Sequence, residues 1–166
     1  MGKLIVNAGI FQVGWILSVL FGNAVALASA LVSSIIYYIY FVTGRRDLTL
    51  ILSVVMLGFA GDTLMGLAGV LIHTNGLPFP PPWMITLWLL FAMTRPWSLR
   101  ALTTKRPLFL LLCVVGGTLS YNVGERLSDV TFGFGQNQTL LILGIVWFLY
   151  GTLILYLVGR WDRSEA

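Results

Sequence analysis

The chain has 166 residues, of which 58% are hydrophobic and only 10% are charged, and its mean hydropathy is +0.91. A soluble domain carries about 25% charged residues, so the composition excludes a soluble domain and predicts a polytopic membrane protein. The net charge of +4 does not indicate nucleic-acid binding. The basic residues stand in short segments between apolar runs, a pattern typical of membrane orientation rather than of a phosphate-binding face.

Six apolar runs predict six transmembrane helices, because about 20 apolar residues cross a bilayer core of about 30 Å. In chain order the predicted helices cover residues 4–22, 24–43, 48–73, 83–99, 107–124 and 139–159. The pair Gly22-Asn23 predicts a tight turn, and four prolines exclude a helix over 74–82. Residues 125–138 are expected to form a loop or a short interfacial segment. The predicted fold class is therefore an all-α polytopic membrane protein with a single domain, residues 1–166.

The basic residues also predict the orientation of these helices. With the N-terminus in the cytoplasm, nine lysines and arginines fall on the inner side and only Arg126 falls on the outer side. The nine are Lys3, Arg45, Arg46, Arg95, Arg100, Lys105, Arg106, Arg160 and Arg163. We therefore expect both termini in the cytoplasm.

Asp62 is the only charged residue in the run 48–73. A carboxylate in the middle of a span costs about 2.5–3.5 kcal/mol on insertion scales, so Asp62 indicates a packing or functional role. The helical rise places it in the outer half of its helix. Three roles stay open: a structural member of a buried polar network, a substrate or proton site in a cavity open to the outer side, and a catalytic acid or base.

Other polar residues are expected at a similar depth. An ion pair between Asp62 and Arg126 is feasible in height, because a long arginine side chain can reach down roughly one or two helical turns. Gln12 in the first predicted helix lies near mid-depth and needs a partner in the membrane. The candidate ligand-binding residues are Asp62, Tyr121, Asn122, Glu125, Arg126 and Gln12.

Metal and cofactor chemistry have little support in the sequence. His73 is the only histidine and Cys113 the only cysteine, so clustered ligands and two-cysteine motifs are not expected. We therefore assign no metal ligand, no cofactor and no catalytic residue. The glycines that surround Asp62 indicate either close helix packing or a locally unwound helix that exposes its carbonyl groups; they are Gly58, Gly61, Gly66 and Gly69.

Several segments, in order, resemble an uncharacterised family of small bacterial inner-membrane proteins known only as a domain of unknown function. The segments are Phe11-Gln12-x-Gly14-Trp15, Gly61-Asp62-Thr63-Leu64, 87–94, Gly116-Gly117-Thr118-Leu119-Ser120-Tyr121 and Gly124-Glu125-Arg126-Leu127. This resemblance implies a bacterial inner-membrane location and no established activity. Members are often encoded near genes for enzymes similar to cyclopropane-fatty-acid synthases, which implies a role around membrane lipids.

Three functions from different classes follow as hypotheses. The first is a non-enzymatic protein that binds a lipid-like or small hydrophobic ligand, or that supports lipid-modifying enzymes. The second is a small transporter or transporter subunit with Asp62 as proton or substrate site, and the third is an intramembrane enzyme that uses Asp62 or Glu125. The expected partners are membrane lipids, a lipid-like ligand, and a second copy or another membrane protein, but no nucleic acid.

Overall fold

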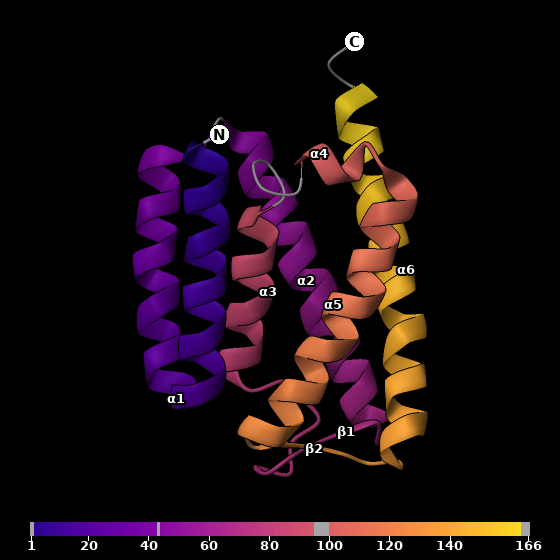
Figure 1. Ribbon diagram of the computed structural model, residues 1–166. Helices are drawn as coiled ribbons and strands as arrows, with labels where there is room; N and C mark the ends of the chain where they lie inside the picture. Colours follow the sequence, from indigo (N-terminus) through magenta and orange to yellow (C-terminus); the bar gives the residue numbers. More distant parts are fainter. Residues whose placement is uncertain (1, 43, 95–99, 164–166) are drawn as a thin grey trace.

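The computed structural model describes residues 2–42, 44–94 and 100–163, and within them the chain forms six helices and two short strands (Figure 1). The helices are α1 (Gly2–Tyr40), α2 (Arg45–Leu67), α3 (Pro82–Thr94), α4 (Arg100–Thr103), α5 (Arg106–Leu127) and α6 (Gln136–Arg163). Four of these helices, α1, α2, α5 and α6, are long and apolar enough to cross a membrane, and α3 is a shorter apolar helix. The prediction of a helical protein with several apolar helices long enough to cross a membrane is confirmed.

Helix α1 folds back on itself at Gly22. The backbone there has φ 69° and ψ −162°, which is not helical, and glycine adopts a positive φ without the steric cost that a side chain brings. Figure 1 shows the two arms of α1 side by side, and the Lys3 ammonium donates a hydrogen bond to the carbonyl oxygen of Tyr40 at 3.2 Å. The chain therefore turns where the pair Gly22-Asn23 predicted a turn.

The segment after α2 differs from the prediction. A helix was expected through His73, but α2 ends at Leu67, and Leu71–His73 forms strand β1. Gly69 has φ 69°, and the N–H of Val70 donates to the carbonyl of Met65 at 2.9 Å. This pattern ends a helix in the left-handed conformation that glycine favours.

Strand β1 pairs with a second strand, β2 (Val130–Phe132), which was likewise not predicted from the sequence. The strands are antiparallel, with Ile72 opposite Thr131. The segment 125–138 is thus neither one loop nor one interfacial segment, because α5 continues to Leu127 and α6 begins at Gln136. Helix α3 is described as far as Thr94, and the predicted end of this helix at residue 99 lies outside the described residues.

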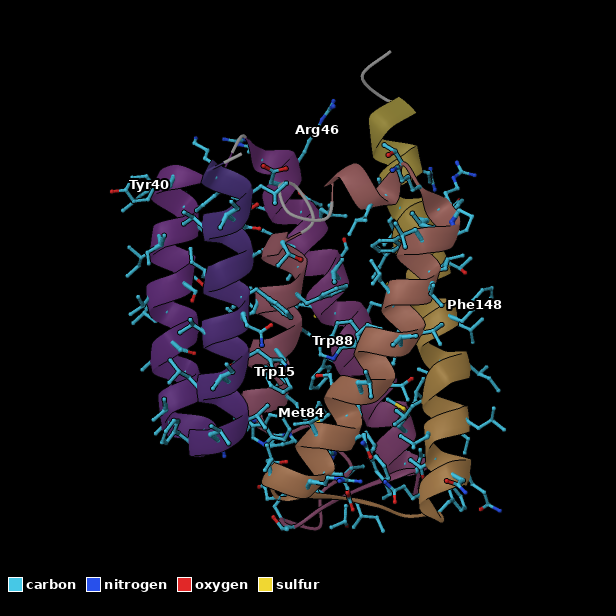
Figure 2. The ribbon with its side chains drawn as sticks, in the orientation of Figure 1. Trp15, Tyr40, Arg46, Met84, Trp88 and Phe148 are labelled. Carbon is cyan, nitrogen blue, oxygen red and sulfur yellow. The ribbon has the colours of Figure 1, made fainter. Side chains whose placement is uncertain are left out.

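The helices pack in two groups. One contains α1, α2 and α3, the other contains α5 and α6, and the two groups touch along a smaller contact. In Figure 1 the start of α1 and the end of α6 lie at one end of the helices, and the two-stranded sheet lies at the other end. Large apolar side chains such as Phe148 project outward from the bundle (Figure 2), and the side chain of Phe148 is 49% exposed. An apolar outer surface is what a lipid environment requires.

Candidate functional site

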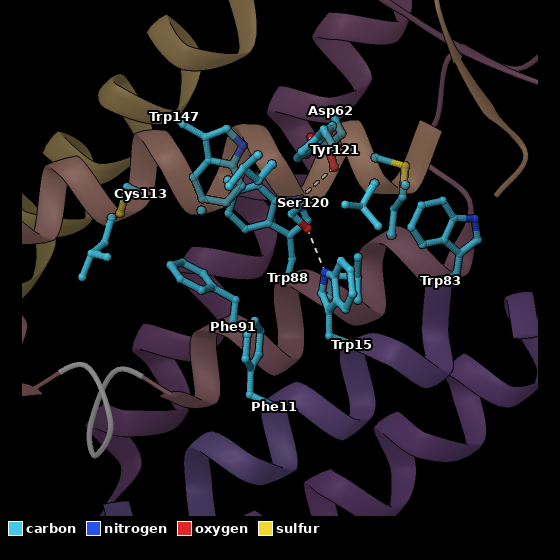
Figure 3. A pocket seen from close by; sticks show the side chains of 18 of the residues that line it. Phe11, Trp15, Asp62, Trp83, Trp88, Phe91, Cys113, Ser120, Tyr121 and Trp147 are labelled. Atoms are coloured by element: carbon cyan, nitrogen blue, oxygen red, sulfur yellow. Dashed lines mark hydrogen bonds between the residues drawn. The ribbon is translucent and has the colours of Figure 1, made fainter. Parts of the chain in front are cut away.

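A pocket of about 620 Å³ lies between the two helix groups. Its wall comes from the first arm of α1, from α3 and from α5, with Asp62 of α2, Val130 of β2 and Trp147 of α6 completing it. Figure 3 shows aromatic side chains from several helices gathered around this space. The aromatic residues of the wall are Phe11, Trp15, Trp83, Trp88, Phe91, Phe109, Tyr121 and Trp147.

Asp62 forms the polar centre of this wall. Its side chain is fully buried, and both carboxylate oxygens accept hydrogen bonds. The hydroxyl of Tyr121 on α5 donates to Oδ1 at 2.5 Å, and Nε1 of Trp88 on α3 donates to Oδ2 at 2.8 Å. The carboxylate therefore joins three helices, and it does so within the wall of the pocket.

Trp88 belongs to a compact aromatic cluster. Its ring stacks on that of Trp147, with centroids 5.1 Å apart and planes 9° apart, and Tyr150 meets both rings edge-on. Stacked and edge-to-face pairs each contribute about 0.5–1.5 kcal/mol beyond the area they bury. The cluster fixes the indole that donates to Asp62.

Glycines make room for these rings. An added Cβ would lie 2.0 Å from the ring of Trp88 at Gly58, and 2.0 Å from the ring of Trp147 at Gly117. Helix α2 is continuous past Gly58 and Gly61. The two glycines that precede Asp62 therefore serve close packing, and the alternative of a locally unwound helix at these positions is wrong.

A hydrogen bond crosses the pocket wall between the two helix groups. Nε1 of Trp15 on α1 donates to Oγ of Ser120 on α5 at 2.8 Å, and Figure 3 shows it as a dashed line. Neither residue was among the predicted site residues. Both belong to segments that carry the family resemblance, and an indole N–H inside an apolar helix needs an acceptor.

The six predicted site residues separate into two sets. Asp62 and Tyr121 are bonded to each other, and Gln12 and Glu125 line the same pocket. Asn122 instead accepts a hydrogen bond from Nε2 of Gln136 at 3.0 Å, away from the pocket wall. Arg126 is exposed in the last turn of α5.

The predicted ion pair between Asp62 and Arg126 is therefore not formed within the described part of the chain. Tyr121 and Trp88 supply the donors to Asp62, and Arg126 does not line the pocket. Depth alone suggested the pair, but the side chain of Arg126 lies at the exposed surface of α5 whereas Asp62 is fully buried.

A second polar group lies beside the sheet, outside the pocket wall. Asp129 accepts hydrogen bonds from Nε1 of Trp83 at 2.9 Å and from Oγ1 of Thr74 at 3.4 Å. His73 is 4% exposed, and neither ring nitrogen has a hydrogen-bond partner among the described residues. Burial lowers the pKa of His73 below its ordinary value of 6.5, and the charge of Asp129 opposes this shift.

Within residues 2–42, 44–94 and 100–163, no three histidine, cysteine, aspartate or glutamate side chains lie close enough to hold a metal ion together. The polar chemistry of the pocket therefore rests on carboxyl, hydroxyl, amide and indole groups. These groups can bind a ligand, fix its orientation or accept a proton from it.

A family model described as "Protein of unknown function (DUF2878)" matches residues 4–153. The chain belongs to this family. The match contains every residue of the pocket wall, from Phe11 to Trp147, and it confirms the resemblance to an uncharacterised domain. The family description assigns no activity. No curated protein and no solved structure gives a significant match.

Proposed function

We propose that this DUF2878 protein binds a small hydrophobic or lipid-like ligand in the pocket between its two helix groups. The observation that carries the proposal is a space of about 620 Å³ with eight aromatic residues and one fully buried, doubly hydrogen-bonded carboxylate in its wall. Ligand pockets are typically about 300–1,000 Å³, mostly apolar, with a few placed polar groups that fix orientation. The size and the chemistry of this wall both fit that description.

The setting that we propose is a bacterial inner membrane crossed six times, with both termini in the cytoplasm. Each arm of α1 supplies one crossing, and α2, α3, α5 and α6 supply the others. The antiparallel arms of α1 and the apolar character of α3 support this count. The bias of nine basic residues against one supports the orientation.

The source of the ligand is proposed to be the membrane itself. A pocket between helices can exchange a hydrophobic molecule with the bilayer, where such a molecule is concentrated. The gene neighbourhood implied by the family resemblance supports a role near lipid-modifying enzymes, by association only. The protein would then hold a ligand, or present it to such an enzyme, without catalysing a reaction.

A pocket-filling variant tests the proposal. A Cβ at Gly116 meets no heavy atom within 4 Å, and this glycine lines the pocket, so Gly116→Leu fills space without an immediate clash. Gly9→Leu is the matched control, since Gly9 is also helical and open but lies outside the pocket wall.

Two measurements apply to the wild-type protein and both variants in mild detergent. Native mass spectrometry with lipid extraction identifies co-purifying molecules, and energy transfer from tryptophan to the neutral probe N-phenyl-1-naphthylamine reports binding. We expect a specific molecule and saturable probe binding in the wild type and in Gly9→Leu, and loss of both in Gly116→Leu. Equal probe binding by all three proteins, with no retained molecule, would contradict the proposal.

A further inference from the structure

The charged groups of the pocket wall all have the same sign. Asp62 and Glu125 line it, and among the described residues no lysine, arginine or histidine does. A fatty acid or a phospholipid phosphate placed here would meet carboxylates and no compensating cation. Like charges at short range in a low-dielectric site repel strongly, so the wall disfavours an anionic ligand.

The two hydrogen bonds that Asp62 accepts stabilise its ionised form. Both of its protein partners are donors, Tyr121 through its hydroxyl and Trp88 through its indole N–H. Because the side chain of Asp62 is fully buried behind these two donors, it acts on a ligand through its charge and not by direct contact. Glu125 follows Tyr121 by one helical turn on α5, and it places a second acceptor in the same wall.

The aromatic rings of the wall favour a positively charged ligand. Ring faces attract a cation within about 6 Å of the centroid, tryptophan most strongly, and desolvation raises the gain to about 2 kcal/mol. Four tryptophans and Tyr121 line this pocket. Aromatic rings arranged around a space with a carboxylate in the wall are the usual means of binding an organic cation.

We propose that the ligand is a hydrophobic organic cation, such as a quaternary ammonium, a phosphonium or a lipophilic amine. Its positive charge lies beside Glu125 and the tryptophan rings, where the charge of the buried Asp62 also attracts it, and its apolar body fills the rest of the pocket. This inference rests on the proposed function and adds the charge of the ligand to it.

Two probes of similar size and opposite charge, tetraphenylphosphonium and tetraphenylborate, test the inference. Equilibrium dialysis of the detergent-solubilised protein measures the binding of each, with Gly116→Leu as the blank. We expect saturable binding of the phosphonium and no competition by the borate. Asp62→Asn should weaken phosphonium binding at least tenfold, and Glu125→Gln should weaken it less.

Asp47→Asn provides the matched control, because Asp47 is on the same helix as Asp62 and lies outside the pocket wall. It should bind the phosphonium like the wild type. Retained binding of neutral N-phenyl-1-naphthylamine shows that a variant is folded, and Glu125→Gln provides the charge test if Asp62→Asn does not fold.

The outcomes separate the two proposals. If the neutral probe binds but the phosphonium does not, or if the borate competes equally, the cation inference is overturned while the binding function stands. Unchanged phosphonium affinity in the folded charge variants also overturns it. If no probe of any charge binds above the Gly116→Leu blank, the proposed function itself fails.

Discussion

Two adjacent glycines on α5 should respond in opposite ways to the same substitution. An added Cβ at Gly117 would lie 2.0 Å from Cδ2 of Trp147, whereas at Gly116 no heavy atom lies within 4 Å. Trp147 cannot move aside freely, because it stacks on Trp88 with ring centroids 5.1 Å apart and is only 7% exposed. Gly117→Ala therefore overpacks the aromatic cluster, and Gly116→Ala does not.

The magnitudes follow from two opposing contributions. Replacing glycine by alanine inside a helix stabilises a protein by about 0.5–1 kcal/mol, and this gain applies to both variants. Overpacking a filled core costs about 1–3 kcal/mol, and a contact of 2.0 Å with a fixed ring places Gly117→Ala at the upper end. The free energy of unfolding should thus rise slightly for Gly116→Ala and fall by about 2 kcal/mol for Gly117→Ala.

Reversible unfolding in mixed micelles, followed by far-ultraviolet circular dichroism as the fraction of denaturing detergent rises, measures both variants against the wild type. Subtracting one free energy of unfolding from the other cancels the helix-propensity gain that both variants share. The remaining difference is the steric cost at Gly117, about 3 kcal/mol. A difference below about 1 kcal/mol, or greater stability of Gly117→Ala, would refute the packing described for Trp147.

Three further predictions concern the polar groups and the topology. Trp88→Phe removes the donor to Oδ2 of Asp62 and should lower the free energy of unfolding by about 1–3 kcal/mol. Tyr121→Phe removes the donor to Oδ1 and should lower it similarly. The same micelle titration measures both variants, and wild-type stability in both would contradict the prediction. The pKa of His73 is lowered in the folded state, so the unfolded state binds more protons near and below pH 6.5, and the free energy of unfolding should decrease as the pH is lowered there. His73→Gln should lose this part of the pH dependence, and a profile unchanged by the substitution would contradict the burial of His73. A reporter fused after Ala166 should read cytoplasmic, and a periplasmic result would contradict six crossings with a cytoplasmic N-terminus.

The sequence identified one polar residue of the pocket wall but not the side chains around it. An isolated carboxylate in an apolar run identified Asp62, because its cost in lipid demands a reason. Helical rise then estimated depth, which selected Tyr121 correctly as a neighbour. Depth does not determine which way a helix faces, however. Asn122 follows Tyr121 by one residue, which is about 100° of rotation, and it bonds to Gln136 instead.

The remaining misses have a different physical origin. In the sequence, Trp88 and Trp147 look like ordinary apolar residues of a membrane helix. They line the pocket because the two rings stack where α3 meets α6. The pairing of Leu71–His73 with Val130–Phe132 joins segments far apart in the chain. Each segment is too short to show an alternating pattern, so neither predicts a strand by itself.

The position of the two-stranded sheet has a mechanical consequence. Strand β1 follows α2 and strand β2 follows α5, so the sheet connects one helix group to the other at a single end of the bundle. Its backbone hydrogen bonds, extended by Gly133 N–H to the carbonyl of Val70 at 3.0 Å, resist separation there. A motion that widens the space between the groups would therefore be a rotation about the sheet, with the largest displacement at the far end, near α4.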